Sequence, residues 1–235
     1  MTTTSIILEE SPRIRTLLIL ADDALILGHR TSEWTGHAPA LEEELALANI
    51  ALDLIGQARA LYQATGLPED DLAYLRDPHQ FRNALIAELP NGDFAFTIVR
   101  LLLVSVASDR FWRGAVAFDD PDIAAIAAKA EKETAYHVRH AADWLIRLGD
   151  GTEESHRRAQ TALTALWPYT GELTDRTDRN AWLSAIDPIL ARATLVRPAD
   201  GWMQSGGRDG RHTEHLGHLL AEMQILPRTY PGATW

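Results

Sequence analysis

Helical periodicity is the feature that most constrains this chain. Apolar side chains recur every three or four residues over long stretches, and the alternation typical of strands is nearly absent. The pattern predicts four long helices, at about residues 11–29, 39–66, 94–118 and 120–149. Ser11 and Asp120 each precede a proline, as N-caps do, while Gly66 with Pro68 and Gly149 with Gly151 mark helix ends. Four long helices with short connections predict an all-α, up-down four-helix bundle.

Shorter helical patterns accompany the bundle. They lie at about residues 79–89, 153–167, 179–195 and 213–228, the third with a kink at Pro188. No low-complexity linker divides the chain, so we predict a single domain over residues 1–235 with additional C-terminal helices. The second long helix carries an apolar stripe formed by Leu41, Leu45, Ala48, Leu52, Ile55 and Tyr62.

Composition excludes several classes of function. The chain has no cysteine, so thiolate catalysis and cysteine-based metal sites are excluded. A formal net charge of -11 opposes binding to nucleic acid. No apolar run approaches the roughly 20 residues of a membrane span, and no signal peptide pattern opens the chain. We therefore expect a cytoplasmic protein without nucleic-acid or membrane partners.

The carboxylates and histidines of the long helices invite comparison with a di-iron site. Ferritin-like di-iron bundles use a carboxylate from each of two helices and a Glu-x-x-His pair from each of the other two. The first helix offers Asp22 and Asp23 inside an apolar pattern. The third helix has Val104 and Ser105 where a carboxylate is required. Asp22 and Asp23 are either inward carboxylates or part of a helix flank that contacts solvent or a partner chain.

Both Glu-x-x-His positions are also altered. Asp53 on the second helix is followed three residues later by Gly56, and Glu133 on the fourth by Tyr136. His137 is displaced by one position, although the stripe around it predicts that it points inward. We therefore predict no catalytic, cofactor or metal site. The expected remnant is a vestigial polar core of side chains that bond to one another, namely Asp22 or Asp23, Asp53, Gln57, Glu133 and His137.

A glycine- and arginine-rich segment at residues 205–211 precedes the last helix. Arginines beside a helix N-terminus can bind an anion, but glycine-rich loops before helices are common. His212, His215 and His218 invite a metal interpretation, but they lack a further ligand at suitable spacing. For both features we favour a structural role.

Several segments are similar to a known family. These stretches are Glu33-Trp34-Thr35-Gly36-His37-Ala38-Pro39, Leu45-Ala46-Leu47-Ala48-Asn49-Ile50, Asp53-Leu54-Ile55-Gly56-Gln57-Ala58-Arg59, Gln80-Phe81, Pro90-Asn91-Gly92-Asp93-Phe94-Ala95, Lys132-Glu133, Tyr136-His137, Trp144-Leu145, His212-Thr213-Glu214-His215-Leu216-Gly217, Leu220-Ala221-Glu222-Met223-Gln224 and the last residue Trp235. They resemble the ferritin-like structural subunit, PaaC type, of the bacterial phenylacetyl-CoA epoxidase. The resemblance covers essentially the whole chain and is weakest at residues 153–198.

The resemblance implies a non-catalytic role. In that multicomponent monooxygenase, a related ferritin-like subunit holds the di-iron centre and a reductase subunit supplies electrons from NADPH. It implies that this chain binds and stabilises the di-iron catalytic subunit, contacts the reductase only indirectly and carries no cofactor. Exposed Trp34, Trp112 and Trp235 are expected to suit a large interface. The alternatives are a metal-binding ferritin-like oxidase with an unorthodox ligand set, and a bundle that associates only with itself.

Overall fold

The computed structural model describes residues 5–233, and all its regular secondary structure is helical. The described residues include no strand, and the all-α, ferritin-like prediction is confirmed. The long helices are α1 (Pro12–Ser32), α2 (Leu41–Ala64), α5 (Phe94–Ala115) and α6 (Pro121–Gly149). The shorter elements are α3 (Glu69–Tyr74), η1 (Pro78–Gln80), α4 (Leu85–Glu88), α7 (Glu153–Leu166), η2 (Trp167–Tyr169), η3 (Gly171–Thr174), α8 (Arg179–Arg192), η4 (Gly207–Asp209) and α9 (Glu214–Thr229).

The predicted helix starts at Ser11 and Asp120 are confirmed. The Ser11 hydroxyl accepts the Ile14 backbone N–H at 3.3 Å. The Asp120 carboxylate accepts the Asp122 and Ile123 N–H groups at 3.0 and 3.2 Å. These bonds satisfy N–H groups that have no partner within a helix, so the local sequence sets where both helices begin.

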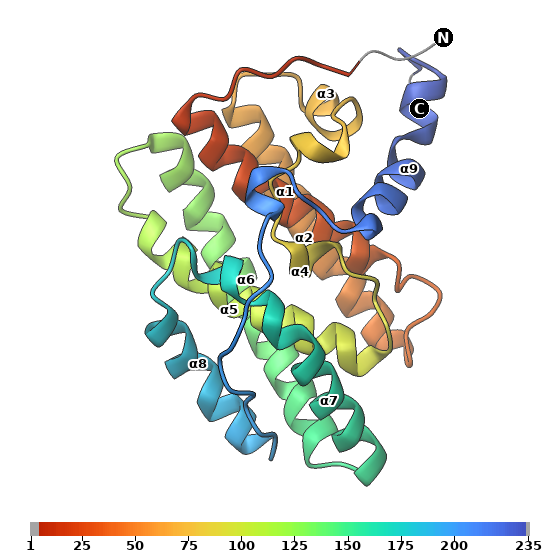
Figure 1. The fold of residues 1–235 in the computed structure, drawn as a ribbon, viewed down its shortest axis with the longest axis vertical. Coiled ribbons are helices and arrows are strands. Elements are labelled where there is room, and N and C mark those ends of the chain that lie inside the picture. Colours follow the sequence, from red (N-terminus) through yellow and green to blue (C-terminus); the bar gives the residue numbers. More distant parts are fainter. Residues whose placement is uncertain (1–4, 234–235) are drawn as a thin grey trace.

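The bundle consists of two helical hairpins. Helix α1 packs along α2 and α5 packs along α6, while α2 contacts α6 across the bundle (Figure 1). Helices α7 and α8 cover α5 and α6, and α9 packs on α3 and α4. Buried leucines such as Leu17, Leu47, Leu102 and Leu145 belong to one continuous apolar core. The core therefore holds both hairpins and fixes how α2 and α6 face each other.

The helix predicted at residues 79–89 is wrong in its middle. Residues 81–84 are extended and separate η1 from α4. The backbone N–H groups of Arg82 and Ala84 donate to the carboxylates of Asp22 and Asp23 at 2.7 Å each. Groups two residues apart point to the same side of an extended chain, so two adjacent aspartates of α1 can hold them both. The segment exchanges helical hydrogen bonds for bonds to α1.

The apolar stripe predicted on α2 lies largely on the outer face of the helix. Leu41, Leu45 and Leu52 are 69%, 58% and 66% exposed. The face that packs into the core instead carries Leu47, Ile50, Ala51, Leu54, Ala58 and Leu61. Both sides of α2 are apolar, and periodicity alone does not tell which of two apolar sides faces inward.

The expected exposure of the tryptophans is wrong for one of them. Trp112 is buried and makes an edge-on contact with Phe111. Trp34 is half-buried, with its indole N–H donating to Thr97 at 3.0 Å. Trp235 lies outside the described residues.

No helix within residues 5–233 is both long enough and apolar enough to pass through a lipid bilayer.

Candidate functional site

Two polar pairs join α2 to α6 at the level of the predicted core. Gln57 donates to Glu133 at 2.9 Å, and Asp53 lies 3.0 Å from the His137 Nε2 atom. His137 is fully buried, which confirms that it points inward. Lys129, one turn away on α6, pairs with Glu133 at 3.2 Å. Four of the predicted polar side chains therefore meet here in pairs.

A third pair on this seam is absent from the predicted core. Glu43 and His140 are nearly buried, and their Oε2 and Nε2 atoms lie 3.3 Å apart. Tyr136, which occupies the position expected for a ligand histidine, stacks on His140 with ring centroids 6.0 Å apart. The only hint of this pair in the sequence is the acidic first turn of α2. Acidic residues are favoured there by the helix dipole in any case, so this turn does not by itself indicate a pair with His140.

Burial favours the neutral form of the two imidazoles on this seam. Burial lowers the pKa of His137 below the ordinary histidine value, and the nearby Asp53 carboxylate only partly opposes this. Burial likewise lowers the pKa of His140, against the opposing effect of Glu43. A neutral ring can donate or accept one hydrogen bond at each nitrogen, which suits a structural pair.

Asp22 does not join this core, so the prediction of one connected network is wrong for it. Its carboxylate is fully buried and accepts from both Arg76 Nη atoms at 3.0 and 2.5 Å and from the Tyr62 hydroxyl at 2.5 Å. Arg76 is also fully buried, and its guanidinium lies over the Phe81 ring. Asp22 therefore anchors α3 and the extended segment to α1.

Asp23 is also directed away from the α2–α6 pairs. It accepts from Arg208 at 2.7 Å and from Arg176 at 3.1 Å. Burial by itself raises the pKa of Asp23, but the two guanidinium groups outweigh burial and the pKa is lowered. The carboxylate therefore stays ionised and ties the segments around η3 and η4 to α1.

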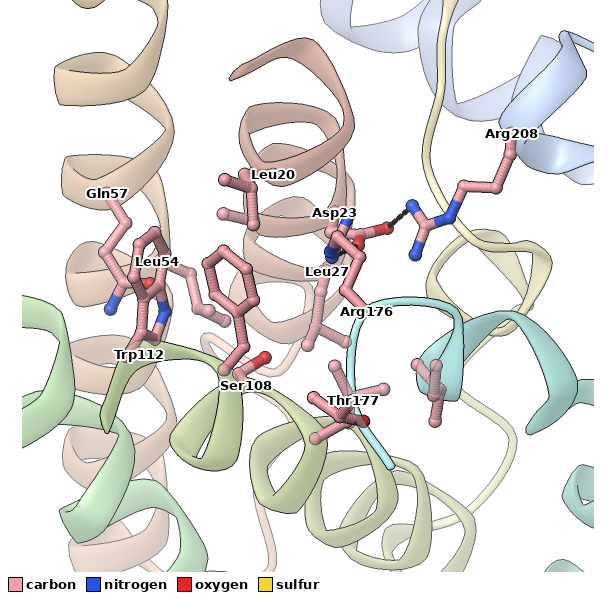
Figure 2. A pocket seen from close by; sticks show the side chains of 15 residues that line it. Leu20, Asp23, Leu27, Leu54, Gln57, Ser108, Trp112, Arg176, Thr177 and Arg208 are labelled. Carbon is pink, nitrogen blue, oxygen red and sulfur yellow. Dashed lines mark hydrogen bonds and ion pairs between the residues drawn. The ribbon is translucent and has the colours of Figure 1, made fainter. Parts of the chain in front are cut away.

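A small cavity separates Asp23 from Gln57. It has a volume of ≈ 40 Å³ and is lined by residues of α1, α2 and α5 together with Arg176 and Arg208. Figure 2 shows Asp23 turned toward Arg208, with Gln57 on the opposite side and Leu20 between them in this view. Both side chains line the cavity, but each bonds elsewhere, Asp23 to Arg208 and Arg176 and Gln57 to Glu133.

The donor set does not fit a dinuclear iron centre. The two carboxylates of α1 are occupied by guanidinium groups, and α5 contributes buried Ser105 instead of a carboxylate. Gly56 and Tyr136 replace the imidazoles that iron would need, and hard carboxylates with imidazole are what such a centre requires. Among residues 5–233, no three His, Asp or Glu side chains are placed to share a metal.

The glycine- and arginine-rich segment is explained by packing. Arg208 points inward to Asp23, and a Cβ on Gly207 would overlap the Asn83 carbonyl oxygen. Gly210 has φ +76° and would overlap the His79 carbonyl oxygen in the same way. The glycines therefore let this segment lie directly on the backbone around the extended residues 81–84.

His212 has a structural partner. Its ring contacts buried Glu88 at 2.7 Å and the Phe81 carbonyl oxygen at 3.0 Å. The same carboxylate accepts the Thr213 backbone N–H at 2.6 Å. The pairing fixes the start of α9 on α4.

Two buried arginines were not predicted from the sequence, and their contacts are structural. Arg100 is fully buried, contacts the Leu89 carbonyl oxygen and the Asn91 amide oxygen, and burial lowers its pKa to about 9. Arg30 donates twice to the Glu88 carbonyl oxygen. This partner of Arg30 lies 58 residues away in sequence, so its burial could not be predicted locally. Arg100 stands inside an almost wholly apolar stretch of α5, and this is the sequence signal that could have indicated its burial.

Comparisons with known proteins identify the family of this chain. The family model described as phenylacetic acid catabolic protein matches residues 2–235. The chain belongs to this family. A relative in Escherichia coli (strain K12), the subunit of 1,2-phenylacetyl-CoA epoxidase designated with the letter C, is 44% identical over 240 residues, which is 93% of this chain and 97% of that protein. Within the phenylacetic acid catabolic protein family, the resemblance to the PaaC type is thereby confirmed.

Proposed function

We propose that this chain is the non-catalytic structural subunit of a 1,2-phenylacetyl-CoA epoxidase complex in aerobic phenylacetate degradation. In this role it binds and stabilises the di-iron catalytic subunit in the cytoplasm, and the reductase subunit is an indirect partner. The observation that carries the proposal is the near full-length similarity to the PaaC-type relative from E. coli.

The chemistry of the seam supports the non-catalytic part. Asp53 and Glu133 would be the carboxylates of a metal site, yet each is engaged with a side chain of the facing helix, His137 and Gln57. A metal ion would have to displace both pairs and would still find only one imidazole among these four side chains. In each pair, the two side chains instead give each other the hydrogen-bond partner that a buried polar group needs.

Co-expression with the catalytic subunit tests the proposal. The chain should co-purify with that subunit and raise its soluble yield or its epoxidase activity on phenylacetyl-CoA. A catalytic subunit that is equally soluble and active without this chain would contradict the proposal.

The alternative is a metal-binding ferritin-like oxidase with an unorthodox ligand set. The observation in its favour is that Asp53, Glu133 and His137 lie on facing helices. Elemental analysis of the purified chain separates the two: we expect far less than one iron per chain, whereas stoichiometric iron would favour the oxidase.

A further inference from the structure

The outer face of α2 has the pattern of a helix-packing surface. Residues 41, 45, 48, 52 and 55 follow the alternating spacing of four and three, and all five are apolar; we call them the outer seam (Leu41, Leu45, Ala48, Leu52 and Ile55). This spacing is the one by which two helices pack side by side. Single exposed leucines are ordinary, but an ordered row with three leucines more than half exposed marks an interaction surface.

The outer seam continues into a groove between α2 and α6. The groove has a volume of ≈ 260 Å³ and lies one helical turn beyond Leu52, where Gly56 begins its wall. Its lining combines small side chains, Ala60 on one side and Ala125 and Ala130 on the other, with the larger Gln57, Ile126, Lys129 and Glu133. A Cβ on Gly56 would meet nothing within 4 Å, so this wall is open. Small side chains let the backbone of another helix approach closely.

Charges of opposite sign mark the two ends of this face. Lys129 lines the groove together with its ion-pair partner Glu133, and Lys132 is exposed on the same helix; they are the chain's only lysines. At the other end of the face, Glu42 is exposed beside Leu41, and Glu44 is half-buried in the same first turn of α2. The complementary partner therefore presents an apolar helix with acidic residues near the lysines and basic residues near the start of α2.

We propose that the outer seam and this groove dock a helix of the di-iron catalytic subunit; the inference rests on the proposed function. From Leu41 to Ile55 the seam extends about 21 Å, enough for about four turns of a partner helix. A net charge of -11 on each copy opposes self-association, which favours a different chain over a second copy. Tyr136 and Arg139, residue types enriched at binding hot spots, lie exposed on α6.

The test compares matched leucine substitutions. Leu45→Glu and Leu52→Glu place a charge in the seam, whereas Leu226→Glu places one at a leucine of α9 that is 53% exposed. Titration of each purified full-length variant with the catalytic subunit gives the Kd. We expect the seam variants to bind at least about 30-fold more weakly, as hot-spot losses do, and the α9 variant to bind like the wild type. Thermal unfolding should be unchanged for all three, because the side chains are exposed.

A second variant tests the charge pattern. The double substitution Lys129→Glu and Lys132→Glu should slow association and reverse its salt dependence. In the wild type, salt screens an attraction and lowers the association rate, whereas in the variant salt screens a repulsion and raises that rate. Association with the wild-type rate and salt dependence would overturn the assignment of an acidic partner to this end.

The outcomes separate this inference from the proposed function. If wild type binds the catalytic subunit and the seam variants bind equally well, the docking face is overturned while the structural-subunit role stands. If the seam variants lose only self-association and keep the Kd, the occupant is a second copy and the inference is overturned. If the wild type does not bind the catalytic subunit at all, both the role and the docking face fail.

Discussion

At the scale of single residues, the adjacent aspartates of α1 show how burial fixes a role. Asp22 and Asp23 point to different partners, Arg76 on one side and Arg208 with Arg176 on the other. A buried carboxylate is tolerated only when opposite charge and hydrogen bonds compensate the loss of water. Both aspartates also hold the extended segment 81–84, so they act as structural anchors between distant parts of the chain.

Asp22→Asn should destabilise the fold strongly. The substitution keeps the shape but removes the charge, and it leaves the fully buried Arg76 guanidinium without its carboxylate. We expect a loss of about 3–5 kcal/mol in the free energy of unfolding, measured by guanidinium chloride denaturation. The control is Asp122→Asn, whose exposed ion pair with Arg13 should contribute less than about 1 kcal/mol. Similar small losses in both variants would contradict the anchoring role.

Stability should fall as the solution is acidified below neutral pH, partly through His137. Its pKa is lowered in the folded state, so the unfolded chain binds the proton at higher pH. The contribution of the neutral His137 to stability is therefore fully present above a pH of about 6.5. It is lost as the pH falls through the pKa of the unfolded chain toward the lower pKa of the folded protein. One such histidine changes the free energy of unfolding by at most about 1.4 kcal/mol per pH unit.

The check is urea denaturation of wild type and His137→Gln between pH 7.5 and 5. The free energy of unfolding of the variant should depend less steeply on pH than that of the wild type. Some pH dependence should remain, because burial also lowers the pKa values of His29 and His140. An identical slope in both proteins would show that His137 does not titrate in this way.

At the scale of elements, close backbone contact decides how the segment around η4 is placed. Gly206 and Gly210 adopt positive φ angles, and Gly207 and Gly210 leave no room for a side chain against residues 79–85. This contact brings Arg208 to Asp23 and His212 to Glu88. The segment thus joins α9 to the bundle without a helix of its own beyond η4.

Gly207→Ala should disrupt this contact. The added Cβ would overlap the Asn83 carbonyl oxygen, which belongs to backbone and cannot move cheaply. We expect a loss of about 1–3 kcal/mol, as for overpacking, measured by thermal unfolding. Gly201→Ala is the matched control, because its Cβ would meet nothing within 4 Å, and it should be close to neutral. Equal midpoints for the two variants would argue against a tight contact at η4.

At the scale of the whole molecule, the α2–α6 seam shows how a ferritin-like bundle can be held together by side-chain pairs. Asp53 with His137, Gln57 with Glu133 and Glu43 with His140 span the two helical hairpins. The first two pairs are hydrogen bonds, which satisfy groups that would otherwise be buried without partners. On another side of α2, the outer seam exposes Leu41, Leu45 and Leu52.

Chelation should leave the stability of the chain unchanged. A metal at one hundred times its Kd would add about 2.7 kcal/mol, and its removal would lower Tm by about 5–10 °C for a chain of this size. Asp53 and Glu133 are engaged with His137 and Gln57, and no three His, Asp or Glu side chains of residues 5–233 are placed to share a metal, so we expect no such shift after dialysis against EDTA, measured by calorimetry. A drop of that size would favour the metal-binding alternative.

Local pattern was sufficient for much of the fold. The N-caps at Ser11 and Asp120 and the periodicity of the long helices predicted the bundle, because caps and amphipathic faces are encoded within one or two turns. The inward position of His137 followed from the same stripe. Gly56 and Tyr136, read at fixed spacing from Asp53 and Glu133, showed that the di-iron ligand pattern is broken, since residues three apart share a helix face.

The remaining features could not be predicted, because the residues that contact one another lie far apart in sequence. By itself the sequence determined the four helices, the caps at Ser11 and Asp120 and the broken ligand spacing, because each depends on neighbours a few residues away. Only the tertiary structure decided that Asp22 binds Arg76, that Asp23 binds Arg208, and which apolar face of α2 packs into the core. The physical reason is that a buried charge takes whichever partner the fold brings near, and a helix with two apolar faces has no local preference between them.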